Sequence, residues 1–169
     1  MKEFDTIIFV GKSGTCREVM ASELLREQAL WHPVEIYARG AVVLFPEPVN
    51  QKAEAVMVSK GMQIGKFLSK QLEEAEVDEN TLVLTFEEDM RKKLSSMFPT
   101  IRYLYVLTHI TGDELEILNP IGGELFTYGI CLESMEKSIK KLADVLNDGS
   151  YFIEEQETDS SASEEETDG

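Results

Sequence analysis

Near its start the chain has a short run of β-branched and apolar residues, then a loop of small residues, then a segment with helical spacing. The run is Thr6-Ile7-Ile8-Phe9-Val10, and runs of this kind are typical of parallel strands that are buried on both faces. From Cys16 onward apolar residues recur at intervals of three to five, which predicts a helix that ends before Pro33. A strand, a tight loop and a helix in this order are typical of α/β folds.

The alternation of strand and helix continues along the chain. Further apolar runs predict strands at residues 34–38, 81–86 and 103–107. Helices are expected over residues 50–61, 69–72, 87–97 and 126–146. The pattern predicts an α/β domain of three layers, in which a four-stranded parallel sheet is flanked by helices. Ligands of such sheets bind beyond the carboxyl ends of the strands, and the first such end is the loop at residues 11–17.

Composition and charge divide the chain into a domain at residues 1–150 and a tail at residues 151–169. The length of 169 residues and the hydrophobic content of 43% suit one domain with a sizeable core. Residues 154–169 carry eight acids and no base, and removing them from the net charge of −16 leaves −8 for the rest. Because this tail has almost no apolar side chains, we expect it to be disordered. It is interpreted as a solubilising segment, with a partner-binding or phosphorylated segment as the alternative.

Several classes of function are disfavoured by the same composition. An acidic body cannot neutralise nucleic-acid phosphates or anionic lipids, so neither nucleic acid nor a membrane is an expected partner. The N-terminus carries acids and does not resemble a secretory signal, and two cysteines are too few for a disulfide framework. We therefore expect a reduced, cytoplasmic protein. His32 and His109 receive no role, and two histidines with two scattered cysteines predict no metal site and no cofactor.

The loop Gly-Lys-Ser-Gly-Thr-Cys-Arg at residues 11–17 has the properties of an anion site. Backbone amides at a helix start, together with the helix dipole, favour negative charge. Gly11 and Gly14 allow the positive φ angles that such a loop needs, and Arg17 offers a two-pronged donor to phosphate oxygens. A nucleotide-binding loop is excluded, because the glycine that it requires would fall at Thr6. The expected anion-binding residues are Lys12, Ser13, Gly14, Thr15, Cys16 and Arg17.

Residues 8–23 resemble the start of the low-molecular-weight protein tyrosine phosphatases and the related arsenate reductases. In that family an apolar strand precedes Cys-x-Gly-Asn-x-Cys-Arg-Ser-Pro-x-Ala-Glu. The Ser-Lys-Gln-Leu segment at residues 69–72 resembles the family's Arg-Gln-Leu segment. Asn-Pro-Ile-Gly-Gly at residues 119–123 resembles its Asp-Pro-Phe-Gly-Gly loop. The resemblance covers about residues 5–147, and it implies the three-layer fold of that family.

The resemblance also implies a mechanism, in which a cysteine attacks phosphorus, the loop arginine and amides hold the oxygens, and an aspartate protonates the leaving group. Carried over by position, the arginine and the second cysteine are retained as Arg17 and Cys16. The nucleophile position is Gly11, the serine after the arginine is Glu18, and the acid position is Asn119. The expected rim of the pocket is formed by Phe45, Asn119 and Tyr128.

Because the cysteine, serine and aspartate of the family pattern are replaced, we interpret the chain as a pseudophosphatase. It would bind phosphate, a phosphotyrosine-bearing ligand or a protein partner without hydrolysis. Two alternatives stay open. One is an enzyme with displaced chemistry, in which Cys16 or a water molecule attacks. The other is a structural interaction protein with an empty pocket.

Glu18 and Cys131 complete the expectations for the site. We expect Glu18 to form an ion pair with Arg17 or Lys12. The alternative is that its charge weakens phosphate binding. Cys131 is expected to belong to the hydrophobic core.

Overall fold

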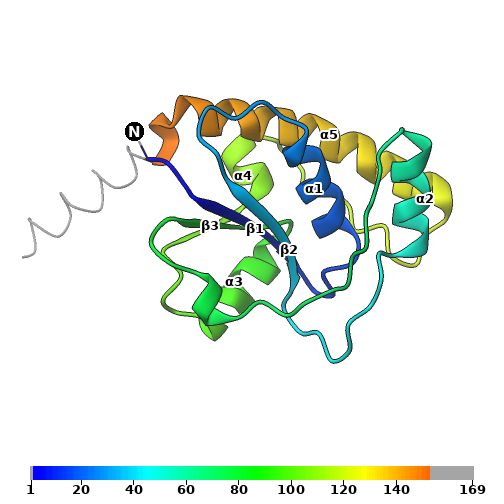
Figure 1. Cartoon of the computed structure of the whole chain (residues 1–169), viewed down its shortest axis with the longest axis horizontal. Helices are drawn as coiled ribbons and strands as arrows, with labels where there is room; N and C mark the ends of the chain where they lie inside the picture. The colour runs from blue at the N-terminus through cyan, green and yellow to red at the C-terminus, as the bar shows by residue number, and fades with distance from the viewer. Residues whose placement is uncertain (1, 153–169) are drawn as a thin grey trace, which may run out of the picture.

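The computed structural model describes residues 2–152, which form a parallel sheet covered by helices on both faces (Figure 1). The strands are β1 (Thr6–Gly11), β2 (Glu35–Gly40), β3 (Thr81–Thr85) and β4 (Tyr103–Val106). They lie in the order β2-β1-β3-β4, and every neighbouring pair is parallel. The predicted four-stranded parallel sheet is thus confirmed.

The helices form the two outer layers. They are α1 (Arg17–Arg26), α2 (Gln51–Ser59), α3 (Glu88–Met97), α4 (Leu107–Thr111) and α5 (Leu125–Asp148). The long helix α5 packs against α1, α2 and α4 on one side of the sheet, whereas α3 packs against β3 and β4 on the other side (Figure 1). The three-layer α/β architecture is therefore the one predicted from the sequence.

Side chains of β1 alternate between the two cores that the sheet separates. Ile7 and Phe9 belong to the larger core, which α1 and α5 complete. Ile8 and Val10 belong to the smaller core, where they meet Leu94 of α3. Because both faces of the central strand are covered, the whole run is apolar instead of alternating with polar residues.

Two segments differ from the expectation. Residues 69–72 form no helix, because the Gly40 amide donates to the Lys70 carbonyl and the Leu72 amide donates to the Gly40 carbonyl, each over 2.9 Å. These bonds hold the segment extended beside the end of β2, and only a short 3-10 helix follows at Glu74–Glu76. Helix α4 was not predicted, because its five residues follow β4 directly and are too few to show a helical period.

The boundaries of the elements follow local chemistry. The Asn50 side chain caps α2 by accepting from the amides of Lys52 and Ala53, each over 3.1 Å, as predicted. Helix α1 ends at Arg26, well before Pro33.

The packed region reaches slightly beyond residue 150. Phe152 is buried and its ring centroid lies 4.9 Å from that of Phe4. The acidic tail lies outside the described residues. Within residues 2–152 no helix is both long and apolar enough to cross a bilayer.

The burial of β1 predicts that two phenylalanines contribute very differently to the free energy of unfolding. Phe9 is fully buried, whereas the Phe45 side chain is 76% exposed. We expect Phe9→Ala to lower the free energy of unfolding by about 3–5 kcal/mol, and the control Phe45→Ala to change it by less than about 0.5 kcal/mol. Urea unfolding of both variants tests this, and equal losses would contradict the assignment of the core.

Candidate functional site

The loop at residues 11–17 joins β1 to α1 at the carboxyl ends of the strands (Figure 1). The segment that links β2 to α2 holds this loop from outside. Its Ala41 amide donates to the Gly11 carbonyl over 2.8 Å, and its Asn50 amide donates to the Thr15 carbonyl over 2.9 Å. These carbonyls are therefore directed to the neighbouring segment, and the loop has a fixed shape.

The two glycines of the loop serve different purposes. Gly14 has a φ of +77°, as predicted, and a Cβ atom there would lie 2.7 Å from the Gly40 amide nitrogen. Gly14 is thus required both for its conformation and for the close approach of the two backbones. Gly11, in contrast, ends β1 and has no positive φ. The expectation of a special conformation at Gly11 is wrong, and the reason for a glycine there is space.

That space is filled by the side chain of Glu18. A Cβ atom on Gly11 would lie 1.5 Å from Glu18 Oε1 and 2.6 Å from Glu18 Cδ. The Cys16 amide donates to Glu18 Oε2 over 3.0 Å, and Glu18 is only 3% exposed. The carboxyl group is therefore turned back into the loop, where the resemblance places the nucleophile of a phosphatase.

The expected ion pair of Glu18 with Arg17 or Lys12 does not form within residues 2–152. The Lys12 side chain is exposed instead. Glu18 lies inside the loop, whereas the Arg17 guanidinium is used elsewhere. The two side chains diverge because the first turn of α1 directs successive residues to different sides of the helix.

Arg17 connects three segments of the fold. Its Nη2 forms an ion pair with Glu87, which follows β3. Its Nη1 donates to the Ile117 carbonyl over 2.8 Å, and its guanidinium carbon lies 5.1 Å from the ring centroid of Phe86. Arg17 is 5% exposed. The anion anchor expected from the sequence is thus already bonded to protein oxygens. Sequence reasoning missed both partners, and the backbone carbonyl carries no signal in the sequence.

The environment of Glu18 shifts its proton equilibrium. Burial raises the pKa of the Glu18 carboxyl above its usual value, and nearby Glu87 raises it further. Its own amide, the Cys16 amide and Arg17 lower the pKa, but the net shift is upward. The carboxyl thus accepts hydrogen bonds from backbone amides at the start of α1 and is shielded from water.

Neither cysteine has the properties of a reactive thiol. Burial first, and then Glu18 and Cys131, raise the pKa of the Cys16 thiol to about 12, although Arg17 lowers it. Cys131 is buried in the core, as predicted, and its Sγ donates to the Leu118 carbonyl over 3.4 Å. Burial also raises the pKa of the Cys131 thiol, to about 11.

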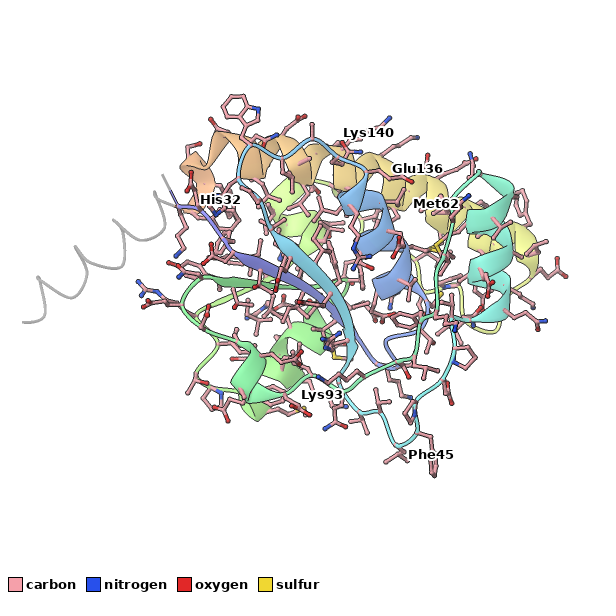
Figure 2. The ribbon with its side chains drawn as sticks, in the orientation of Figure 1. His32, Phe45, Met62, Lys93, Glu136 and Lys140 are labelled. Atoms are coloured by element: carbon pink, nitrogen blue, oxygen red, sulfur yellow. The ribbon has the colours of Figure 1, made fainter. Side chains whose placement is uncertain are left out.

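The three residues expected at the rim occupy different surroundings. Phe45 projects from the segment between β2 and α2 (Figure 2), beside a hollow of about 240 Å³ that Ser13 also lines. Asn119 is exposed and its Oδ1 accepts from the Ile121 amide over 3.2 Å. Tyr128 is 2% exposed and its hydroxyl accepts from Asn50 Nδ2 over 3.3 Å. Tyr128 therefore joins α5 to the start of α2 and does not form a rim.

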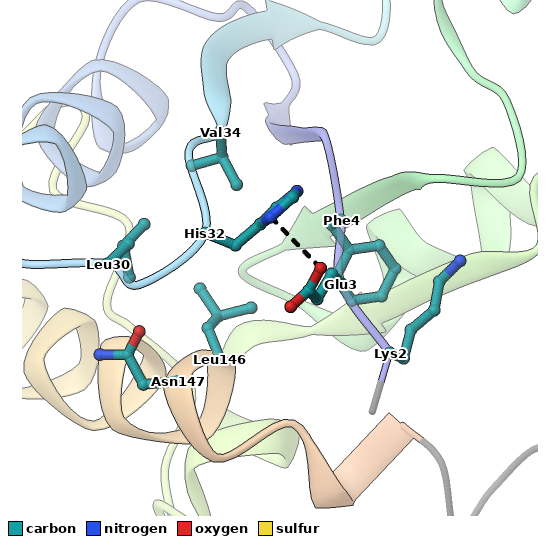
Figure 3. A pocket seen from close by; sticks show the side chains of 8 residues that line it. All are labelled: Lys2, Glu3, Phe4, Leu30, His32, Val34, Leu146 and Asn147. Atoms are coloured by element: carbon teal, nitrogen blue, oxygen red, sulfur yellow. Dashed lines mark ion pairs between the residues drawn. The ribbon is translucent and has the colours of Figure 1, made fainter.

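A second, smaller cavity lies at the start of β1, at the opposite end of the strand from the loop (Figure 3). Its volume is about 30 Å³. His32 lines it and pairs with Glu3 over 3.3 Å and with Asp5 over 3.2 Å. This histidine thus contributes to the surface packing of the N-terminus. Among residues 2–152, no cluster of histidine, cysteine and acidic side chains could hold a metal ion.

Comparisons with known proteins agree with the fold. Residues 6–150 match the family described as low molecular weight phosphotyrosine protein phosphatase. The chain belongs to this family.

Two relatives illustrate the range of the family. The chain is 27% identical over 142 residues to a protein-arginine-phosphatase of Geobacillus stearothermophilus, covering 83% of this chain and 95% of that protein. It is 24% identical over 140 residues to the low molecular weight protein-tyrosine-phosphatase PtpB of Staphylococcus aureus, covering 83% and 98%. The structure of the YwlE arginine phosphatase from Geobacillus stearothermophilus is similar with a TM-score of 0.77 and 26% identity, covering 86% of this chain and 95% of that one.

The raised pKa of Glu18 predicts how stability depends on pH. Because the folded-state pKa lies above the ordinary value of 4.5, the folded chain holds a proton that the unfolded chain has released. The free energy of unfolding of the wild type, relative to Glu18→Gln, should therefore fall as pH rises above about 4.5. Urea unfolding across this range measures the difference, with Glu23→Gln on the same helix as the control. A difference that rises with pH would contradict the buried position.

The burial of both thiols predicts that they are inert in the folded protein. We expect a thiol-specific colorimetric reagent at pH 8 to label neither Cys16 nor Cys131 rapidly, because each thiol is buried and has a raised pKa. In denaturant both thiols should react. Rapid labelling of Cys16 in the native protein would contradict this result and would favour displaced chemistry.

Proposed function

We propose that this chain is a catalytically inactive member of its family, a pseudophosphatase that acts by binding a protein partner. One observation supports this most directly. The nucleophile position is Gly11, and the space beside it is taken by the Glu18 carboxyl, whose Oε1 lies 1.5 Å from where a Cβ atom would be. A thiolate cannot attack phosphorus from this position, because neither the sulfur nor the room for it exists.

The other chemical steps also lack their groups. Asn119 stands where an aspartate would protonate the leaving group, and an amide has no proton to give at neutral pH. Attack by Cys16 is disfavoured, because its thiol is buried and burial raises its pKa to about 12. Attack by water is disfavoured as well, since the carboxyl that could act as a base is enclosed and bonded to the Cys16 amide.

The geometry favours a protein partner over free phosphate. The resting loop holds the Glu18 carboxyl, and Arg17 is engaged by Glu87 and the Ile117 carbonyl. The pocket is therefore filled, in contrast to the empty pocket of the structural alternative. Beside the loop, the neighbouring residues Leu44 and Phe45 are 82% and 76% exposed, and contiguous exposed apolar side chains are typical of surfaces that bind proteins. Two free, buried cysteines support a reducing, cytoplasmic location.

The proposal predicts no turnover of either substrate class that the relatives' names suggest. Purified protein should release phosphate from an aryl phosphate and from a phosphoarginine peptide no faster than buffer does. Turnover above buffer that is lost in the conservative variant Arg17→Lys would overturn the proposal. Loss of such turnover in Cys16→Ser would identify the displaced nucleophile.

A further inference from the structure

We propose that the Glu18 carboxyl is a built-in ligand of the phosphate loop, which occupies the interior of the loop and excludes oxyanions such as phosphate. This inference rests on the proposed function, because only a loop without a nucleophile can hold a permanent internal ligand at no catalytic cost.

Gly11 and Glu18 are complementary in shape. Glu18 Oε1, Cδ and Cγ would lie 1.5, 2.6 and 3.2 Å from a Cβ atom on Gly11, so any larger residue would have to displace the carboxyl group. Gly11 has no positive φ, and its conformation therefore does not require glycine. The substitution at one position thus makes room for the side chain at the other, which is what an internal ligand needs.

The carboxyl also makes a contact that a bound anion would make. The Cys16 amide at the start of α1 donates to Glu18 Oε2 over 3.0 Å, and amides at a helix start are suited to negatively charged oxygens. Glu18 is 3% exposed, so the carboxyl lies within the loop and not on its surface. A single side chain therefore supplies both the oxygen and the volume of a ligand.

The loop keeps donors that Glu18 does not use. Within the part of the chain that the structure describes, the amides of Ser13, Gly14 and Thr15 donate no hydrogen bond to another residue. The Gly11 and Thr15 carbonyls are held by the segment after β2, which fixes the loop independently of Glu18. Removal of the carboxyl should therefore leave a shaped site with free donors, and an oxyanion can accept from them.

The test is to titrate purified full-length protein with inorganic phosphate at pH 7 and to measure the affinity by isothermal titration calorimetry. Glu18→Ser should bind phosphate more than about tenfold tighter than the wild type, a change of about 1.4 kcal/mol. The matched control is Glu23→Ser, which removes a carboxyl group from the same helix, where Glu23 pairs with Arg26 outside the loop. The control should bind phosphate as weakly as the wild type.

A second variant opens the loop without changing Glu18. Gly11→Ala places a methyl group where the carboxyl lies and should expel it, so this variant should also gain phosphate binding. It serves as the decisive variant if Glu18→Ser does not fold.

Phosphate binding by Gly11→Ala or Glu18→Ser no tighter than by the wild type would overturn the inference. It would leave the lack of turnover, and hence the proposed function, untouched. An equal gain in Glu23→Ser would also overturn it, because net charge alone would then explain the effect.

Discussion

The space at Gly11 and the carboxyl of Glu18 that fills it determine the rest of the site. A carboxyl group enclosed among backbone amides needs donors, and the loop between β1 and α1 supplies them. Burial, and then this carboxyl group, raise the pKa of the neighbouring Cys16 thiol, and the carboxyl lies beside Gly11, where the resemblance places the nucleophile. One side chain thus accounts for the filled interior of the loop and for the lack of catalysis that we propose.

Arg17 has a structural role in this arrangement. With the loop interior taken, its guanidinium bonds to Glu87 after β3 and to the Ile117 carbonyl before α5. A buried arginine whose two Nη atoms bond to different segments stabilises the contact between those segments. Its loss would leave the buried Ile117 carbonyl without a donor. The family's anion-binding residue therefore holds together the carboxyl edge of the sheet in this chain.

The fold could be predicted from the sequence because its signals are local. The apolar run at residues 6–10, the cap at Asn50 and the long apolar face of α5 each specify an element without reference to the rest of the chain. Residues 69–72 could not be predicted, since their backbone bonds to Gly40 depend on tertiary contact. The sequence predicted the loop as an anion site, and by its resemblance it placed Gly11 and Asn119 where the family has cysteine and aspartate; these assignments stay predictions. The direction of the Glu18 side chain and the partners of Arg17 could not be found, because both depend on packing between segments far apart in the sequence.

A crystal structure of the wild-type protein, grown in phosphate or soaked with orthovanadate, would test most directly whether Glu18 occupies the loop in place of an oxyanion. We predict electron density for the Glu18 carboxyl beside Gly11, bonded to the Cys16 amide, with no oxyanion among the loop amides. An oxyanion held by the amides of residues 12–17, with Glu18 turned out toward solvent, would contradict it.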